Sequence, residues 1–203
     1  GTLKHVYTDD DTYAYGDAIG SHTRSNHLRT ESVWTIIGTT PAVPPEQTVT
    51  VDTSWNGSLS FTKDERSQRT DCVDGEEYLL LTSSGQGTGQ QQLGISPYED
   101  TDRVTFALIG SGPPNVIQVT GSQTIQSCNG GGPITQPVNT TRDDGVTAFL
   151  ACLGPDASGI LAPDPSDPGH YAGRNTCDHR ETPNLGGAHV VDTTVEWDLR
   201  RSR

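Results

Sequence analysis

The chain has 203 residues, of which 31% are hydrophobic and 6% aromatic. Its formal net charge is -13, so general nucleic-acid binding is not expected, because contacts with phosphate groups need Lys and Arg side chains. No run of about 18 apolar residues occurs, so no transmembrane segment is predicted. The abundance of Gly, Pro and Thr favours strands and turns over helices.

Short apolar or alternating segments, separated by turn residues, recur along the chain. None has the period of a helix, and the spacing of the turns is typical of a β-sandwich or barrel. Asn56-Gly57 is the strongest short hairpin signal and is expected to join two of the strands. We therefore predict an all-β, single domain over residues 1–203 with about nine antiparallel strands. In chain order, the predicted strands are residues 2–7, 32–37, 48–52, 58–62, 77–82, 103–109, 115–120, 146–152 and 189–199.

Long connections rich in Gly, Pro or charged residues are expected between these strands. Residues 9–30 are predicted as a polar stretch and residues 63–74 as a charged loop. Residues 83–94 are a low-complexity run of Gly, Gln and Ser that favours a flexible segment. Residues 153–187 are predicted as an irregular excursion with five prolines. The last strand, residues 189–199, has the cleanest alternation and predicts one apolar and one solvated face.

The four cysteines are Cys72, Cys128, Cys152 and Cys177, and none is close enough to another for a CxxC motif. An even number in such a chain is best explained by two disulfides formed in an oxidising compartment. Three pairings are possible. We favour Cys152–Cys177, which closes the irregular excursion, together with Cys72–Cys128. Four buried thiols in a cytosolic protein are the alternative.

Further features favour a secreted, extracellular or cell-surface location. Two triplets, beginning at Asn56 and Asn139, match the acceptor pattern for N-glycosylation. The chain has 18 Asp against 8 Glu, and 11 Arg against 2 Lys. This acidic composition fits either a high-salt habitat, where cations relieve the self-repulsion, or GC-rich coding in a secreted bacterial protein.

The sequence offers candidates for two kinds of metal site. Ca²⁺ takes several oxygen ligands, so a structural calcium ion in an acidic loop is one possibility. Transition metals take His and carboxylate ligands, and the loop near Cys177 is rich in both. Solvated polar loops are the simpler alternative, and no motif requires a cofactor. The candidates are Asp9, Asp10, Asp11, Asp164 and Asp167 for calcium, and His170, Asp178, His179, Glu181 and His189 for a transition metal.

The three tryptophans could form either core or a binding platform. Trp34 and Trp197 share strand faces with Ile36 and Val195, so core packing is expected for both. Trp55 precedes the predicted turn and is expected to be exposed. An exposed indole at this position could stack on a sugar ring.

No catalytic constellation is convincing, and no enzyme activity is predicted. We expect a non-enzymatic extracellular structural or surface protein that assembles with copies of itself into a filament or coat, by adding a strand to a neighbour's sheet. One alternative is a secreted carbohydrate- or calcium-binding module with surface glycans as partners. Another is a secreted hydrolase or metalloenzyme that uses the His170–His189 region. The predicted assembly strands contain Leu3, His5 and Tyr7 near one end, and Val191, Val195, Trp197 and Leu199 near the other.

Overall fold

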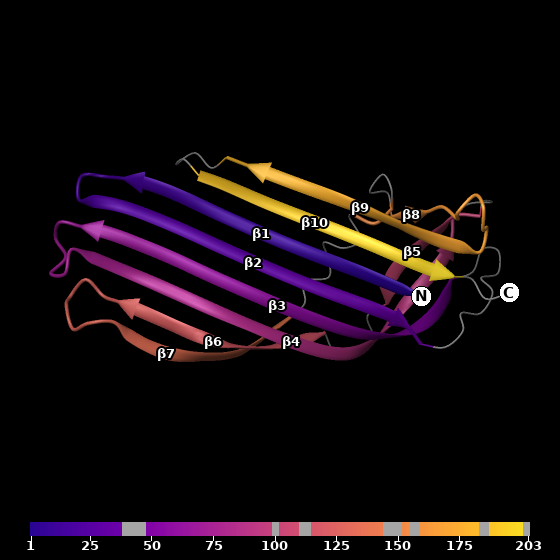
Figure 1. Cartoon of the computed structure of the whole chain (residues 1–203), viewed down its shortest axis with the longest axis horizontal. Helices are drawn as coiled ribbons and strands as arrows, with labels where there is room; N and C mark the ends of the chain where they lie inside the picture. Colours follow the sequence, from indigo (N-terminus) through magenta and orange to yellow (C-terminus); the bar gives the residue numbers. More distant parts are fainter. Residues whose placement is uncertain are drawn as a thin grey trace.

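The computed structural model describes residues 1–37, 48–98, 102–109, 115–143, 152–154, 159–182 and 187–200. They form one antiparallel sheet of ten strands, so the all-β prediction is confirmed (Figure 1). Within these ranges the chain has no helix that could cross a membrane. The strands are β1 (Thr2–Gly16), β2 (Gly20–Ile36), β3 (Val49–Arg69), β4 (Glu76–Pro97), β5 (Val104–Ile109), β6 (Val116–Gln126), β7 (Ile134–Asp143), β8 (Ile160–Leu161), β9 (His170–Glu181) and β10 (Gly187–Arg200).

The main path of the sheet has the order β7-β6-β4-β3-β2-β1-β10-β9. Strand β4 is long enough to have two partners on one side: its residues 78–86 pair with β6, and its residues 92–97 pair with β5. Strand β8 pairs with β5 and so extends the sheet beyond it. Just before β5, the carbonyl oxygen of Asp102 accepts a hydrogen bond from Tyr171 Oη of β9 at 2.7 Å. The sheet therefore curls on itself at one end and continues as a single layer towards the other.

We call these two parts the closed end and the open end. The closed end includes the chain start, β5 and β8, and the open end carries the turns at residues 17–19, 70–75 and 127–133 (Figure 1). Successive side chains of a strand point to opposite faces. The face that carries the core at the closed end is the inner face, and the other is the outer face.

The hydrophobic core lies on the inner face of the closed end. Trp34 and Trp55 are directly opposed across β2 and β3, and each is 0% exposed. The Trp55 indole lies against Gly57, where an added Cβ would come within 2.1 Å of the ring, and Gly87 gives it similar room. The glycines thus create the space that the buried ring fills. Other members of the core are Leu3, Leu59, Leu93, Phe106, Ile117, Leu153, Leu161, Val195, Trp197 and Leu199.

This packing overturns three predictions made from local patterns. Asn56-Gly57 does not form a turn but lies in the middle of β3. Residues 83–94 are not a flexible segment but part of β4, whose alternate glycines face the inner side. Trp55 is buried rather than exposed, so its indole is not placed to meet a sugar. The core positions predicted for Trp34 and Trp197 are confirmed.

Other predicted loops are also strands. Residues 9–30 form most of the β1–β2 hairpin, and β3 continues through the charged segment to Arg69. The predicted irregular excursion, residues 153–187, contains the regular strand β9. These segments lack an apolar face, which is why alternation alone did not reveal them. Residues 146–151 of the predicted strand 146–152 lie outside the described residues.

Both predicted disulfides, Cys72–Cys128 and Cys152–Cys177, are confirmed. The first joins the β3–β4 turn to the β6–β7 turn at the open end, where Val73 N also donates to Cys128 O at 3.1 Å. The second holds residues 152–154 against β9. Each end of the sheet is therefore cross-linked by one disulfide.

The predicted assembly strands are both internal to the sheet. Strand β1 pairs with β2 on one side and with β10 on the other, and β10 pairs with β1 and β9. Neither strand has an open edge, so the prediction that they complete a neighbour's sheet is wrong. It concerned Leu3, His5 and Tyr7 in β1, and Val191, Val195, Trp197 and Leu199 in β10. The edge strands of the main path are β7 and β9.

Candidate functional site

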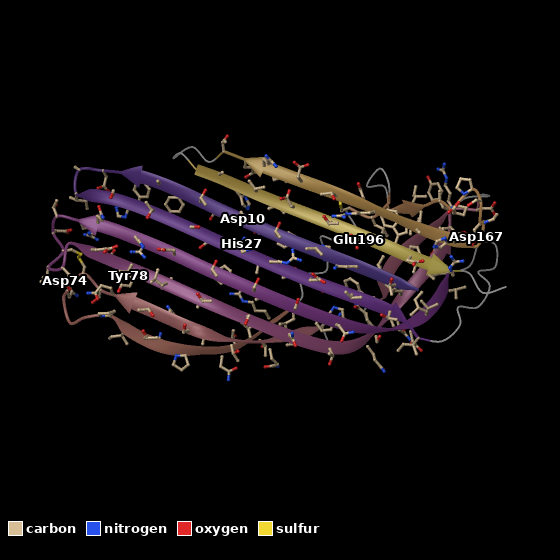
Figure 2. The ribbon with its side chains drawn as sticks, viewed as in Figure 1. Asp10, His27, Asp74, Tyr78, Asp167 and Glu196 are labelled. Atoms are coloured by element: carbon tan, nitrogen blue, oxygen red, sulfur yellow. A yellow bond between two sulfur atoms is a disulfide. The ribbon has the colours of Figure 1, made fainter. Side chains whose placement is uncertain are left out.

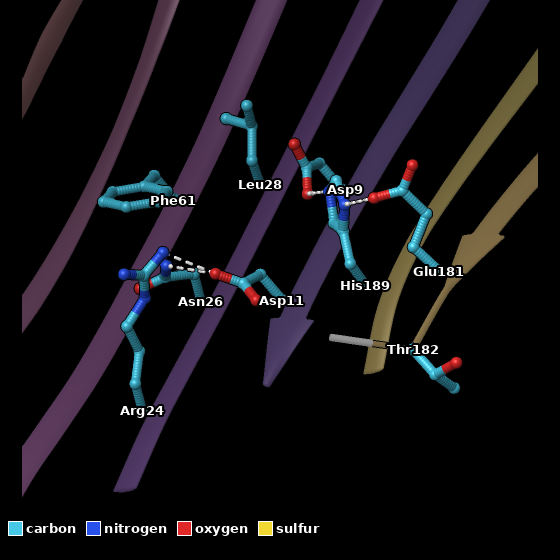
Figure 3. Close-up of a pocket in the computed structure, with 9 residues that line it drawn as sticks. All are labelled: Asp9, Asp11, Arg24, Asn26, Leu28, Phe61, Glu181, Thr182 and His189. Atoms are coloured by element: carbon cyan, nitrogen blue, oxygen red, sulfur yellow. Dashed lines mark hydrogen bonds and ion pairs between the residues drawn. The ribbon is translucent and has the colours of Figure 1, made fainter. Parts of the chain in front are cut away.

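A half-open pocket of about 720 Å³ lies on the inner face, where the core gives way to polar side chains (Figure 3). Strand pairing builds it, because residues far apart in the chain occupy neighbouring positions. Asp11 of β1 lies between Asn26 of β2 and His189 of β10 in the register, and His189 lies opposite Glu181 of β9. Residues from five strands and from Thr182, just after β9, therefore line one space.

One wall of the pocket is a compact polar cluster. Arg24 donates from Nη2 to Asp11 Oδ2 at 2.5 Å. Oriented with its oxygen towards the guanidinium, the Asn26 amide accepts from Arg24 Nε at 2.7 Å. The cluster presents donors and acceptors in fixed planar groups, which can form paired hydrogen bonds to a polar ligand.

The floor of the pocket is apolar, and an aromatic row continues from it. Leu28 and Phe61 are directly opposed on β2 and β3. Towards the β1–β2 turn, Tyr15 stacks on His22 with ring centroids 4.6 Å apart, and on Tyr13 at 5.9 Å. The Arg24 guanidinium covers the Tyr13 ring at 5.4 Å, so the aromatic row joins the polar cluster.

On the opposite side of the pocket, Asp9, Glu181 and His189 belong to a row of titratable groups, which hydrogen bonds join at every step except that between His189 and Glu181. Tyr7 Oη donates to Asp9 Oδ2 at 3.1 Å, and the other Asp9 oxygen, Oδ1, lies 3.0 Å from His189 Nε2. His189 Nδ1 lies 4.0 Å from Glu181 Oε2, and Glu181 Oε1 lies 2.8 Å from His179 Nε2. Burial, reinforced by Asp9, raises the pKa of Tyr7. The hydrogen bond from His179 holds the pKa of the Glu181 carboxyl below its usual range.

The loop conformation predicted for Asp9, Asp10 and Asp11 is wrong, because these residues lie in β1. Their side chains alternate, and Asp10 points to the outer face, where it lies 2.5 Å from His27 Nδ1 (Figure 2). Three carboxylates on two faces of a sheet cannot share an ion.

The second predicted calcium loop does form a turn. Asp164 accepts from the Ser166 backbone N at 2.8 Å, and Asp167 accepts from Arg200 Nη1 at 3.0 Å. Calcium at this turn stays a prediction.

The candidate transition-metal ligands are divided between the faces. His170 lies on the outer face with Asp198, at 2.9 Å, and Asp178 lies on the same face with Arg180. His179, Glu181 and His189 lie together on the inner face. Across the described part of the chain, three potential ligand atoms lie within 4.8 Å of one another only at Glu77 and the two cysteines of one disulfide, Cys72 and Cys128.

The predicted glycosylation sites both lie on the outer face. Asn56 of β3 and Asn139 of β7 are exposed there. Glycans at these positions would therefore leave the pocket clear, because it opens on the inner face.

Several residues of the pocket and of the aromatic row escaped the sequence analysis. Tyr13, Tyr15, Arg24 and Phe61 lie in segments predicted as polar or short, and none belongs to a recognised motif. The signal that could have found them is the two-residue period of β1, which aligns Asp9, Asp11, Tyr13 and Tyr15 on one face.

Comparison with known proteins adds no functional assignment. No family model matches the chain, and no curated protein or solved structure compared with it shows significant similarity. The function is therefore inferred from the geometry of the inner face.

Proposed function

We propose that the protein is an extracellular, non-enzymatic binding protein whose inner face holds a carbohydrate. The observation that carries the proposal is the continuous array of polar and aromatic side chains from the pocket to the β1–β2 turn. On β1 it comprises Asp9, Asp11, Tyr13 and Tyr15. At about 3.3 Å per residue, this stretch is about 20 Å long, which suits an oligosaccharide.

The chemistry of the array matches that of a sugar chain. Sugar rings have apolar C–H faces and hydroxyl edges, so aromatic rings can cover the faces while planar polar groups meet the hydroxyls. Most small-molecule pockets are largely apolar. This pocket instead combines Asp11, Arg24 and Asn26 with a floor of Leu28 and Phe61, which favours a strongly polar ligand.

The extracellular location is supported by the two disulfides, which persist in oxidising compartments. The placement of Asn56 and Asn139 is compatible with glycosylation and with an open binding face.

A panel of immobilised oligosaccharides tests the proposal. The Asp11→Asn variant should weaken binding about tenfold or more, because a hydrogen bond to a charged group contributes about 1.5–3 kcal/mol. Asp10→Asn is the matched control: it changes the neighbouring residue of the same strand, whose side chain lies on the outer face. Failure of the unmodified protein to bind any sugar, or equal losses in both variants, would contradict carbohydrate binding.

Self-association through the sheet edges is the second candidate function. Every neighbouring pair in the eight-strand main path is antiparallel, so β7 and β9 run in opposite directions. A copy placed edge to edge in the same orientation would continue the antiparallel order and generate a filament. However, β7 contains Pro137 and β9 carries Arg174 and Arg180, features that protect edge strands from pairing. Light scattering in native salt tests this candidate, and a monomer at all concentrations would contradict it.

A further inference from the structure

We propose that His179, Glu181 and His189 form a binding site for a divalent transition-metal ion such as zinc, with Asp9 orienting His189. Glu181, His189 and Asp9 lie on the β9–β10 side of the pocket (Figure 3), and His179 adjoins Glu181 on β9. The proposal does not depend on carbohydrate binding, because it concerns an ion bound by the protein alone.

The sheet places the three ligands next to one another. His179 and Glu181 are two residues apart on β9, so their side chains share the inner face. Glu181 is directly opposite His189 of β10, and His179 is diagonal to it. Directly opposed side chains have Cβ atoms about 5 Å apart, and diagonal ones are within reach of long side chains. The backbone thus presents an imidazole, a carboxylate and a second imidazole within one patch.

The donor atoms match zinc in kind, and two of their separations can be compared with those of zinc ligands. Zinc binds imidazole nitrogen and carboxylate oxygen at about 2.0–2.2 Å, and tetrahedral ligands at that distance lie about 3.4 Å from each other. The His179 Nε2–Glu181 Oε1 distance is 2.8 Å, and the His189 Nδ1–Glu181 Oε2 distance is 4.0 Å. These two distances lie on either side of the required value, but they involve different oxygens of Glu181. No choice of one donor atom from each of the three residues brings all three within 4.8 Å of one another, so zinc binding requires the side chains to rotate. The side chains of His179 and Glu181 are 66% and 62% exposed, so small rotations about their bonds are unhindered.

Asp9 gives His189 the arrangement expected of a metal ligand. Its Oδ1 lies 3.0 Å from His189 Nε2, and we assign the ring proton to Nε2, which leaves the Nδ1 lone pair directed towards Glu181. Tyr7 donates to Asp9 Oδ2 and so fixes this carboxylate in turn. Histidine ligands commonly donate their second ring N–H to a carboxylate, which fixes the ring and strengthens the metal bond. A bound cation would also compensate the two carboxylates that flank one imidazole.

Titration of the metal-stripped, disulfide-intact protein with Zn²⁺ tests the site. We expect one ion per chain, with affinity reduced at least tenfold in His189→Gln and in Glu181→Gln. Asp9→Asn should also weaken binding by about 10–100-fold, as expected for loss of a group that supports a ligand. His170→Gln is the matched control, because His170 also contacts a carboxylate but lies on the outer face.

Substitution with Co²⁺ supplies a readout of coordination. The proposal predicts visible d–d bands without thiolate charge-transfer bands, since all four cysteines are in disulfides, and His189→Gln should abolish them. Absence of saturable one-to-one binding, or equal losses in His170→Gln and His189→Gln, would overturn the proposal. Thermal unfolding of each variant distinguishes a lost ligand from a misfolded chain, because every substituted residue is on the surface or only partly buried.

Discussion

The closed and open ends of the sheet are built from the same strands but are stabilised differently. At the closed end, β5, β8 and residues 152–154 cover the inner face and bury tryptophans and aliphatic side chains. At the open end, the inner face of β1, β2 and β3 carries the polar pocket and the aromatic row instead. The difference shows that one long strand can contribute to a core with one half and to a binding face with the other.

The energetic contrast follows from burial. A buried aromatic side chain removes about 150–250 Å² from water, which stabilises the fold by several kcal/mol at about 25 cal/mol per Å². Exposed ion pairs of the open end, such as Arg66–Glu76, contribute about 0–1 kcal/mol each. The closed end therefore holds the fold, and the open end relies on backbone pairing and on the Cys72–Cys128 disulfide.

The largest expected effect is at Trp55. Trp55→Ala should lower the free energy of unfolding by about 4 to 5 kcal/mol, because it leaves a cavity above Gly57 and Gly87. Tyr15→Ala, in the aromatic row of the open end, should cost less than about 1 kcal/mol, as is usual for a surface substitution. Denaturant unfolding measures both values, and similar losses would remove the distinction between the two ends.

The open-end disulfide should come next. Removing Cys72–Cys128 by paired Cys→Ser substitution should cost about 4 kcal/mol in the chain-entropy treatment, because the bond closes a loop with a sequence separation of 56. The loss of amide protection should be concentrated in the β3–β4 and β6–β7 turns. Hydrogen exchange checks this, and the closed-end core of the same variant is the internal control. Equal loss of amide protection in that core would contradict the prediction that the disulfide stabilises mainly the turns that it joins.

Stability should also depend on pH through His5, which is buried in the closed end. Burial lowers the pKa of His5 from 6.5 to about 4. Between these pH values the unfolded chain binds the proton more readily, so stability is complete above about pH 6.5 and falls as the pH decreases towards 4. The loss should total about 3 kcal/mol. His5→Leu should flatten this part of the stability profile, and an unchanged profile would contradict the assignment.

The smallest effect is expected on the outer face of the open end. Arg66 contacts Asp64 at 2.8 Å and Glu76 at 3.2 Å, in an exposed cluster. Arg66→Gln should lower stability by no more than about 1 kcal/mol, and high salt should remove most of the difference. A larger, salt-independent loss in denaturant unfolding would show that the open end is held by its surface charges.

Local patterns predicted the architecture but not the extent of the strands. The recurring short segments and the spacing of the turns predicted the all-β class, and the positions of the cysteines favoured the observed pairing among the three possible ones. Asn56-Gly57 was misinterpreted as a turn because Gly57 is needed for another reason: it leaves room for the Trp55 ring. The burial of that ring depends on strands that are distant in the chain.

The candidate site was only partly accessible from the sequence for a related reason. His179, Glu181 and His189 were candidates because they are close in sequence. Arg24 and Phe61 were not, because only the register of β1, β2 and β3 brings them to the pocket. In a single-layered region, both faces are polar, so composition does not distinguish a strand from a loop.

Hydrogen exchange along single strands tests the division of the sheet most directly. In β1 and β2, amides of the closed-end residues 3–7 and 30–36 should exchange at least about tenfold more slowly than those of the open-end residues 9–15 and 22–28, because local opening requires less energy where little apolar surface is buried. Uniform protection along both strands would contradict the account.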